Sequence, residues 1–437
     1  MGLNLYLSLS TDIAPELGEY ERMTTTAANA YIQPIAEGYL AELQAALQNL
    51  GHQGQLYFMW SDGGLASAQT TLQAPIRLLE SGPAAGALAV RHFAKALNIH
   101  RALAFDMGGT TAKICLIRSG EPSLSPSFEI GRVHRNKPGS GTTVKVPSIH
   151  MLEIGAGGGS LGHLDDLGLI KVGPKSAGAE PGPACYGSGG EQPTVTNANL
   201  LLGYLSEEAT LAGGLKLDKA KAEQAANTLG QVANLTAHDI AVGIRRIVTE
   251  NMAQAAQLHV TESGEDPRDY TLLAFGGAAP LHAFDVAKAL GIRQVILPKR
   301  AGVLSAFGFL TARVGLEQVQ SCVMSLNAIN KTYLLNILND LKQKASASLS
   351  AGNVAAKDMK FDFALDMRFQ GQGYDVQVPI RLENLEKDAL ESAFRIAYRK
   401  RYGEGQEGSV EIRACRLSAY GPEPLLKIAR QTLTTKY

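Results

Sequence analysis

The residue types best suited to chemistry gather in residues 105–117, FDMGGTTAKICLI. A hydrophobic run reaches the carboxylate of Asp106, passes through a turn of two glycines and two threonines, and continues as a second hydrophobic run. Adjacent glycines let backbone amides point at phosphate oxygens with no Cβ in the way, and the threonine hydroxyls add donors. Asp106 could hold Mg²⁺ directly or through water. The segment is typical of a phosphate-binding hairpin, and equally of an ordinary hairpin turn with a solvated aspartate.

A second pair of glycines lies in residues 271–284, TLLAFGGAAPLHAF, between a buried strand and a helix that begins at Pro280. Such a turn can place backbone beside a nucleotide base or ribose, and it also allows close packing of a strand on a helix. A phosphate hairpin followed by a strand–Gly-Gly–helix unit is the arrangement of the actin, sugar-kinase and heat-shock ATPase superfamily. The two segments together therefore favour nucleotide binding more than either does alone.

These segments need a scaffold of helices and strands to position them. Apolar spacing predicts helices at 31–51, 218–231 and 237–264, and a strand–helix–strand unit at 271–298 implies parallel pairing. Residues 120–200 are rich in Gly, Pro, Ser and Thr and resist periodic assignment, as functional or disordered regions usually do. The pattern predicts an α/β fold.

The character of the sequence changes beyond about residue 315. A polar helical stretch at 331–349 precedes an alternating segment at 361–380, a second helix at 385–402 and a strand at 410–420. We expect a separate C-terminal α+β domain that begins near residue 320.

Composition narrows the classes of function. The 437 residues carry 41 Lys and Arg against 41 Asp and Glu, so charge gives no global case for nucleic acid or an anionic membrane as partner. No run of 18 apolar residues and no secretion signal occurs. The cysteines are isolated singles without metal-ligand spacing, as is typical of reduced thiols in a cytoplasmic protein; they are Cys115, Cys185, Cys322 and Cys415.

In the order and spacing of its motifs, the sequence resembles the hydantoinase A/oxoprolinase family, in particular its ATP-dependent N-methylhydantoinase A-like members. The resemblance runs from about residue 5 to beyond 400. It rests on SGPAAG (81–86), FDMGGTTAK (105–113), EIGAGGGS (153–160), VGPKSAGAEPGPACYG (172–187), PTVTNANLLLGYL (193–205), FGGAAPLHA (275–283), GVLSAFGFL (302–310) and GQGYDVQVP (371–379).

This resemblance implies an ATP-dependent enzyme that hydrolyses a cyclic amide, such as hydantoin, 5-oxoproline or a lactam, by phosphorylating its carbonyl oxygen. ATP and Mg²⁺ are the implied cofactors, and Asp106 is the implied catalytic and metal-binding residue. The glycines of residues 155–160 would lie near the nucleotide or the substrate channel, and a crowded crossing of chains is the structural alternative. The implied nucleotide-binding residues are Gly108, Gly109, Thr110, Thr111, Gly157, Gly158, Gly276 and Gly277.

The implied fold has actin-like, ribonuclease H-like lobes, of which the first is incomplete. Residues 1–100 would be the remainder of the first lobe, 101–318 the hydantoinase A core, and 319–437 the C-terminal α+β domain. Family chains typically begin with a DxGGTxxD loop in an N-terminal domain, and no second DxGGT occurs here. We therefore expect either a separate chain that supplies this domain or a truncated product of a longer gene.

The resemblance also implies a hydantoinase B-type partner subunit and a small-molecule substrate. Two other interpretations stay open: an ATP-using subunit of a ketone carboxylase, and a non-catalytic member of the family.

Several positions depart from the family pattern. His150 and Asn197 stand where relatives commonly carry Asp, so the charge is lost there and an ion held at either position would be bound differently or not at all. Glu180 also replaces Asp, which preserves the charge. Cys185 is expected to be buried rather than nucleophilic, because the sequence identifies no activating base. The other histidines of the core form no ligand pair; they are His134, His163, His259 and His282.

Overall fold

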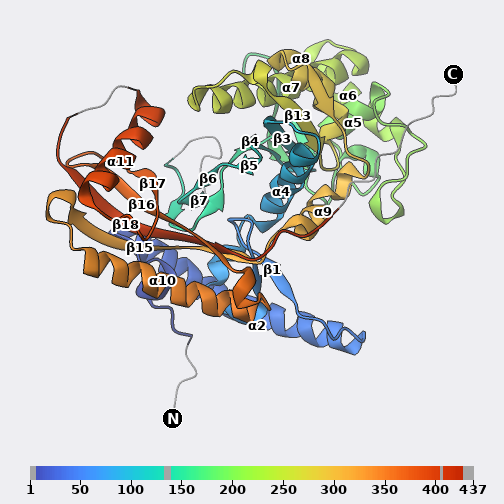
Figure 1. Cartoon of the computed structure of the whole chain (residues 1–437). Coiled ribbons are helices and arrows are strands. Elements are labelled where there is room, and N and C mark those ends of the chain that lie inside the picture. The colour runs from blue at the N-terminus through green and yellow to red at the C-terminus, as the bar shows by residue number, and fades with distance from the viewer. Residues whose placement is uncertain (1–5, 132–138, 404–406, 427–437) are drawn as a thin grey trace.

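The computed structural model describes residues 6–131, 139–403 and 407–426. Its elements form a larger region around a mixed sheet and a smaller region around an antiparallel sheet (Figure 1). The α/β class predicted from the sequence is confirmed. Within the described part of the chain, every helix is too short or too polar to cross a membrane.

Six strands make up the mixed sheet: β3 (Arg101–Met107), β4 (Ala112–Arg118), β5 (Glu121–Pro122), β10 (Met151–Ile154), β13 (Thr271–Phe275) and β14 (Gln294–Ile296). Their order is β10-β4-β3-β13-β14, with β5 paired to β4. β3 and β4 form an antiparallel hairpin, and β10 is antiparallel to β4. β13 is parallel to β14, as the strand–helix–strand pattern predicts, and it is also parallel to β3.

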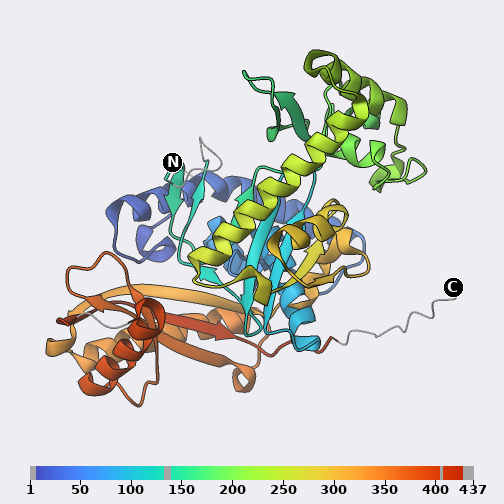
Figure 2. The same cartoon turned by 90° about the horizontal axis from the view of Figure 1, so that it is seen from above.

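Helices cover both faces of this sheet. One face carries α4 (Ser81–Ala96) and α9 (Leu304–Thr311). The other carries α7 (Ala237–Glu262) and α8 (Ala279–Leu290), with α5 (Val195–Leu201) and α6 (Lys219–Ala233) packed beside them. Figure 2 shows α7 lying diagonally across the strands.

Alternation along β3 sends its side chains to opposite faces. Leu103 and Phe105 join the core beneath α7 and α8, whereas Ala102 and Ala104 join the core beneath α4. Asp106 continues the second series, so its carboxylate lies on the α4 face.

Small residues bring α4 and α9 close to each other. Ala84, Ala85 and Ala89 are fully buried, and a Cβ on Gly308 of α9 would lie 1.8 Å from the carbonyl oxygen of Ala85. Because α4 shares a hydrophobic core with β3, β4 and β13, the domain boundary expected at residue 100 falls inside that core.

Short strands explain why residues 120–200 show no periodicity. Most of them have two to five residues, too few for an alternating pattern to be recognised. His134 lies outside the described residues. The strands are β6 (Leu124–Ser125), β7 (Phe128–Ile130), β8 (Thr142–Val144), β9 (Ser148–Ile149), β11 (Ser160–Leu164) and β12 (Ile170–Ser176).

The smaller region is an antiparallel sheet of order β15-β18-β16-β17, and it shares one hydrophobic core with two helices. The helices predicted at 331–349 and 385–402 correspond to α10 and α11. The boundary expected at residue 318 falls inside its first strand. The elements are β15 (Gly315–Ser325), α10 (Lys331–Ala351), β16 (Lys360–Phe369), β17 (Val376–Ile380), α11 (Lys387–Tyr402) and β18 (Val410–Tyr420).

The N-terminal elements contribute residues to both regions: Met59 joins the core beneath α4, and Ala66 joins the core of the C-terminal sheet. The helix predicted from residue 31 begins earlier, at Glu19, and contains Pro34. An isolated bridge between Leu65 and Val314 ties this part to the start of the C-terminal sheet. The elements are α1 (Ser10–Ile13), α2 (Glu19–Asn49), β1 (Tyr57–Met59), β2 (Leu65–Ser67) and α3 (Ala68–Gln73).

Candidate functional site

The turn between β3 and β4, residues 108–111, is exposed and carries unused hydrogen-bond donors. It closes through a hydrogen bond of 3.1 Å from the Gly108 amide to the carbonyl oxygen of Thr111. Among the described residues, the amides of Gly109 and Thr110 have no protein acceptor. A Cβ on Gly108 or Gly109 would meet nothing within 4 Å, so the backbone there is open to a ligand. The turn can therefore offer backbone N–H groups to an anion.

A second glycine segment, residues 157–159, lies directly against this turn. The amide of Gly158 donates to the carbonyl oxygen of Gly108 at 3.0 Å, and that of Gly159 donates to the carbonyl oxygen of Gly109 at 2.7 Å. A Cβ on Gly157 would lie 2.5 Å from the carbonyl carbon of Thr110. The crowded crossing of chains is thus present at these glycines.

The turn between β13 and α8 comes to the same place. Gly276 has a left-handed backbone with φ +88°, and a Cβ there would lie 2.3 Å from a carboxylate oxygen of Asp106. The amide of Ala278 donates to the carbonyl oxygen of Met107 at 2.9 Å. Gly277 is exposed with nothing within 4 Å of its Cβ position. The structure therefore gathers all three predicted glycine segments at one end of the sheet, around Asp106.

Burial dominates the electrostatics of Asp106. Burial raises the pKa of this carboxyl to about 6, and the nearby positive charge of Lys113 partly offsets that rise. The two residues are paired across the hairpin, and a gap of only about 10 Å³ lies between them and Pro83 of α4. The ammonium of Lys113 donates to Glu80 at 2.7 Å. With a pKa of about 6, the carboxyl of Asp106 is mostly ionised at neutral pH.

These residues fit a magnesium–nucleotide group in the chemistry of their donors. Carboxylate oxygen is the ligand that Mg²⁺ prefers, and free amides on a glycine turn suit phosphate oxygens. No cluster of three or more acidic, histidine or cysteine side chains suited to a metal ion occurs among the described residues.

Sequence reasoning missed three residues around this site. Lys113 is paired with Asp106 across the hairpin and donates to Glu80, and Thr196 donates through its hydroxyl to the carbonyl oxygen of Gly158 at 2.8 Å. The place of Lys113 opposite Asp106 could have been predicted, because a hairpin with a four-residue turn after Met107 pairs residue 113 with residue 106. Nothing in the local sequence places Glu80 or Thr196 beside the turn.

The departures from the family pattern lie away from the turn or behind it. The ring of His150 lies 5.0 Å from that of His259, and burial lowers the pKa of both imidazoles, that of His259 to about 4. Asn197 is buried, and its Oδ1 accepts from Thr194 at 2.6 Å. Cys185 is fully buried, as expected, and burial raises the pKa of its thiol to about 12.

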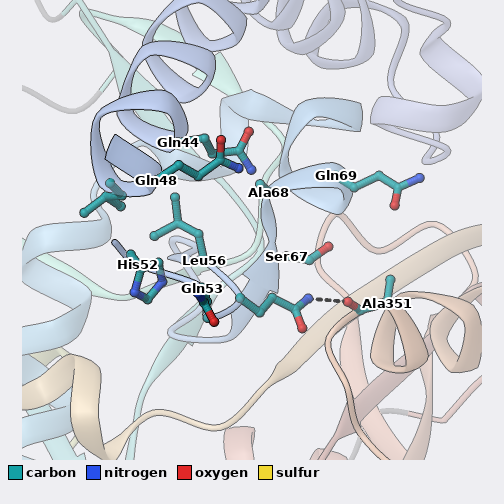
Figure 3. Close-up of a pocket in the computed structure, with 12 residues that line it drawn as sticks. Gln44, Gln48, His52, Gln53, Leu56, Ser67, Ala68, Gln69 and Ala351 are labelled. Carbon is teal, nitrogen blue, oxygen red and sulfur yellow. Dashed lines mark hydrogen bonds between the residues drawn. The ribbon is translucent and has the colours of Figure 1, made fainter. Parts of the chain in front are cut away.

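Two other hollows contain few of the predicted residues. A groove of about 1080 Å³ between β10, β12 and α7 has an apolar lining that includes Leu152, Ile170 and Leu258. A pocket of about 310 Å³ near the end of α2 is lined by glutamines, among them Gln44, Gln48 and Gln53 (Figure 3). The glutamine pocket includes none of the predicted site residues.

Comparison with known proteins identifies relatives along most of the chain. Residues 22–318 match the family model described as hydantoinase/oxoprolinase. An uncharacterised protein of Methanocaldococcus jannaschii is 38% identical over 86% of this chain and 55% of its own length. The caprolactamase α subunit of Pseudomonas jessenii is 32% identical over 91% of this chain and 56% of its own length. The chain thus spans about half the length of these relatives.

Solved structures agree with this result. A crystal structure of ATP-dependent caprolactamase from Pseudomonas jessenii superposes with a TM-score of 0.82 at 30% identity, covering 100% of this chain and 63% of that chain. A nucleotide-free structure of acetone carboxylase shares the fold, with a TM-score of 0.77 at 24% identity over 97% of this chain and 60% of that chain.

Proposed function

The chain belongs to the hydantoinase/oxoprolinase family, and from this premise we propose that it is the ATP-binding component of an ATP-dependent hydrolase acting on a cyclic amide. Hydantoin, 5-oxoproline and lactams are the candidate substrates. One observation carries the proposal: two unused amides, those of Gly109 and Thr110, lie on an open glycine turn directly after the carboxylate of Asp106.

In this proposal the turn holds the phosphates of ATP. The amides of Gly109 and Thr110 donate to phosphate oxygens, and the hydroxyls of Thr110 and Thr111 add donors. Gly276 and Gly277 border the adenosine. In its deprotonated form Asp106 would hold Mg²⁺, which would supply positive charge beside the phosphoryl group being transferred.

The order of the central strands supports an actin-like lobe. β3, β4 and β10 form an antiparallel meander, and β13 and β14 follow as parallel strands on the other side of β3. This is the strand order of a ribonuclease H-like sheet, and it places the β3–β4 turn and the β13–α8 turn at the same end.

Phosphoryl transfer explains why a cyclic amide needs ATP. Resonance with the nitrogen lone pair makes an amide carbonyl a poor electrophile, and phosphorylation of its oxygen creates a better one for water. The chain's contribution is mainly the positioning of phosphates and the neutralisation of charge.

We also propose a hydantoinase B-type subunit as the partner that completes the enzyme. The name of the caprolactamase relative, an α subunit, supports a division of the activity between chains. The fold shared with acetone carboxylase favours a second candidate, the ATP-using subunit of a ketone carboxylase.

ATP hydrolysis by the chain and its partner separates these candidates. Caprolactam, hydantoin and 5-oxoproline should each be supplied without bicarbonate, and acetone with bicarbonate. Stimulation by a cyclic amide alone supports the proposal, whereas stimulation only by ketone with bicarbonate supports the carboxylase. Absence of Mg-ATP binding and of any stimulation would leave a non-catalytic family member.

A further inference from the structure

We propose that Thr196 and the glycine segment 157–159 are positioning residues. They bind the side of the β3–β4 turn opposite its free amides, orient those amides, and do not contact nucleotide. This inference rests on the proposed function of that turn. It assigns the segment 157–159 a different part from direct nucleotide binding, and it adds Thr196 to the residues on which nucleotide affinity depends.

The backbone groups of residues 158 and 159 are already engaged by protein. The amides of Gly158 and Gly159 donate to the turn, at 3.0 Å and 2.7 Å. The carbonyl oxygen of Gly158 accepts from both the amide and the hydroxyl of Thr196, at 2.7 Å and 2.8 Å. The carbonyl oxygen of Gly159 accepts from the amide of Ala177 at 2.8 Å. An amide that donates to a protein carbonyl is not free to donate to phosphate.

Because a peptide is planar, these contacts also fix the direction in which the neighbouring amides point. In a trans peptide, the carbonyl of one residue and the amide of the next point in opposite directions. Both peptides of the turn, 108–109 and 109–110, are trans. Because the carbonyl of Gly108 is held by Gly158, the amide of Gly109 points away from the segment. The carbonyl of Gly109 is held by Gly159, so the amide of Thr110 also points away.

Two chains of hydrogen bonds, here called relays, therefore fix the orientations of the two free donors, the amides of Gly109 and Thr110. One runs from Thr196, at the start of α5, through Gly158 to the carbonyl of Gly108. The other runs from Ala177, after β12, through Gly159 to the carbonyl of Gly109. Each relay places one outward N–H, and the two N–H groups are adjacent along the chain, as suits two oxygens of a phosphate chain.

Steric crowding requires glycine in the segment 157–159, and not in the turn itself. A Cβ on Gly157 would come within 2.6 Å of the carbonyl oxygen of Gly109, and a Cβ on Gly159 within 3.1 Å of the same atom. By contrast, a Cβ on Gly108 or Gly109 meets no protein atom within 4 Å. A side chain on Gly157 would push the turn out of place although it touches no ligand.

Thr196 offers the sharper test, because its hydroxyl can be removed with little change of shape. Thr196→Val deletes the 2.8 Å hydrogen bond to Gly158 and keeps the amide bond, whereas Thr196→Ser keeps both. Thr228→Val is a matched control, since it removes a hydroxyl hydrogen bond of 3.0 Å to the carbonyl of Gln224 on the exposed face of α6. Calorimetry should measure Mg-ATP affinity for these variants and wild type, with adenosine as a second ligand and thermal midpoints recorded.

We expect Thr196→Val to weaken Mg-ATP binding about fivefold, the scale of one lost hydrogen bond, and to leave adenosine affinity unchanged. Thr196→Ser and Thr228→Val should bind Mg-ATP within about twofold of wild type. Gly157→Ala should weaken Mg-ATP more than Thr196→Val does.

Wild-type affinity in Thr196→Val, or equal losses of Mg-ATP and adenosine affinity, would overturn the positioning role while the proposed function stands. Absence of Mg-ATP binding in the wild-type protein with its partner would overturn both. If Gly157→Ala does not fold, the two Thr196 variants still decide the question.

Discussion

Asp106 borders an open glycine turn and is itself largely buried. Burial raises its pKa to about 6, and Lys113 opposes that rise. The carboxylate type and its place before the glycines were predictable from the sequence. Its burial was not, because burial depends on α4 and Gly276, which approach from distant parts of the chain.

Replacement of Asp106 by Asn should abolish Mg-dependent ATP hydrolysis. The amide has nearly the same shape but is a poor ligand for Mg²⁺, so we expect a loss of about 10²-fold or more in turnover. The fold should persist, because a neutral group suits a buried position better than a charged one. Steady-state ATPase rates and thermal midpoints check both parts, and turnover within a few-fold of wild type would remove Asp106 from the metal role.

The pH dependence of hydrolysis should report the same carboxyl. The pKa of Asp106 is raised, so its metal-binding form dominates above about pH 6 and is lost below it. ATPase activity at subsaturating Mg²⁺ should fall about tenfold per pH unit below that value. Lys113→Met removes the charge that lowers this pKa, so its acid limb should move to higher pH, whereas Lys113→Arg should keep it in place. If the acid limb of the pH–activity profile of Lys113→Met is unchanged or moves to lower pH, the assignment to Asp106 is wrong.

At the scale of elements, sequence patterns predicted the β3–β4 hairpin, α7, α8 and the parallel pairing of β13, because each has a local period or turn signal. They did not predict that the segment 157–159 supports the turn at 108–111. That contact joins residues about 50 positions apart, and its hydrogen bonds are between backbone groups, which leave no side-chain pattern. The short strands of residues 120–200 escaped for a related reason, since two or three residues carry no recognisable alternation.

The packing of α4 on α9 gives a prediction at this scale. Gly308→Ala places a Cβ against the carbonyl oxygen of Ala85, where the distance would be 1.8 Å. The helices must move apart, which should cost about 1–3 kcal/mol of unfolding free energy. Gly302→Ala, in the same motif with nothing within 4 Å, is the control and should change stability little. Denaturant unfolding measures both, and equal stabilities for the two variants would contradict the close approach.

Across the whole molecule, a buried ionic cluster joins the N-terminal elements to the C-terminal sheet. Arg416 contacts Asp366 at 2.8 Å, Glu317 at 3.5 Å and Glu16 at 3.7 Å. Arg77 and Asp62 extend the cluster toward β1 and β2. Composition revealed only a net charge of zero, and the segregation of these charges into one buried group follows from the tertiary fold.

Burial raises the pKa of Glu317 in this cluster, and this effect is larger than the opposing effect of Arg416, which lowers the pKa. A carboxyl with a raised pKa stabilises the fold when protonated and loses that contribution as pH rises through its folded-state pKa. Glu317→Gln, which stays neutral, should therefore be more stable than wild type at pH 8, with a difference that shrinks toward pH 4.5.

Thermal midpoints across this pH range check the prediction. Glu383→Gln on the exposed surface is the control and should show no such trend. A Glu317→Gln protein less stable than wild type at pH 8 would indicate that the ion pair with Arg416 outweighs the cost of burial.

The proposed activity of this chain depends above all on the binding of ATP phosphates by the β3–β4 turn. A crystal structure with Mg²⁺ and a non-hydrolysable ATP analogue, determined with the partner subunit present, tests it most directly. We predict phosphate oxygens within hydrogen-bonding distance of the Gly109 and Thr110 nitrogens, with the ion beside Asp106. Phosphates bound elsewhere, with these two amides still unused, would contradict it.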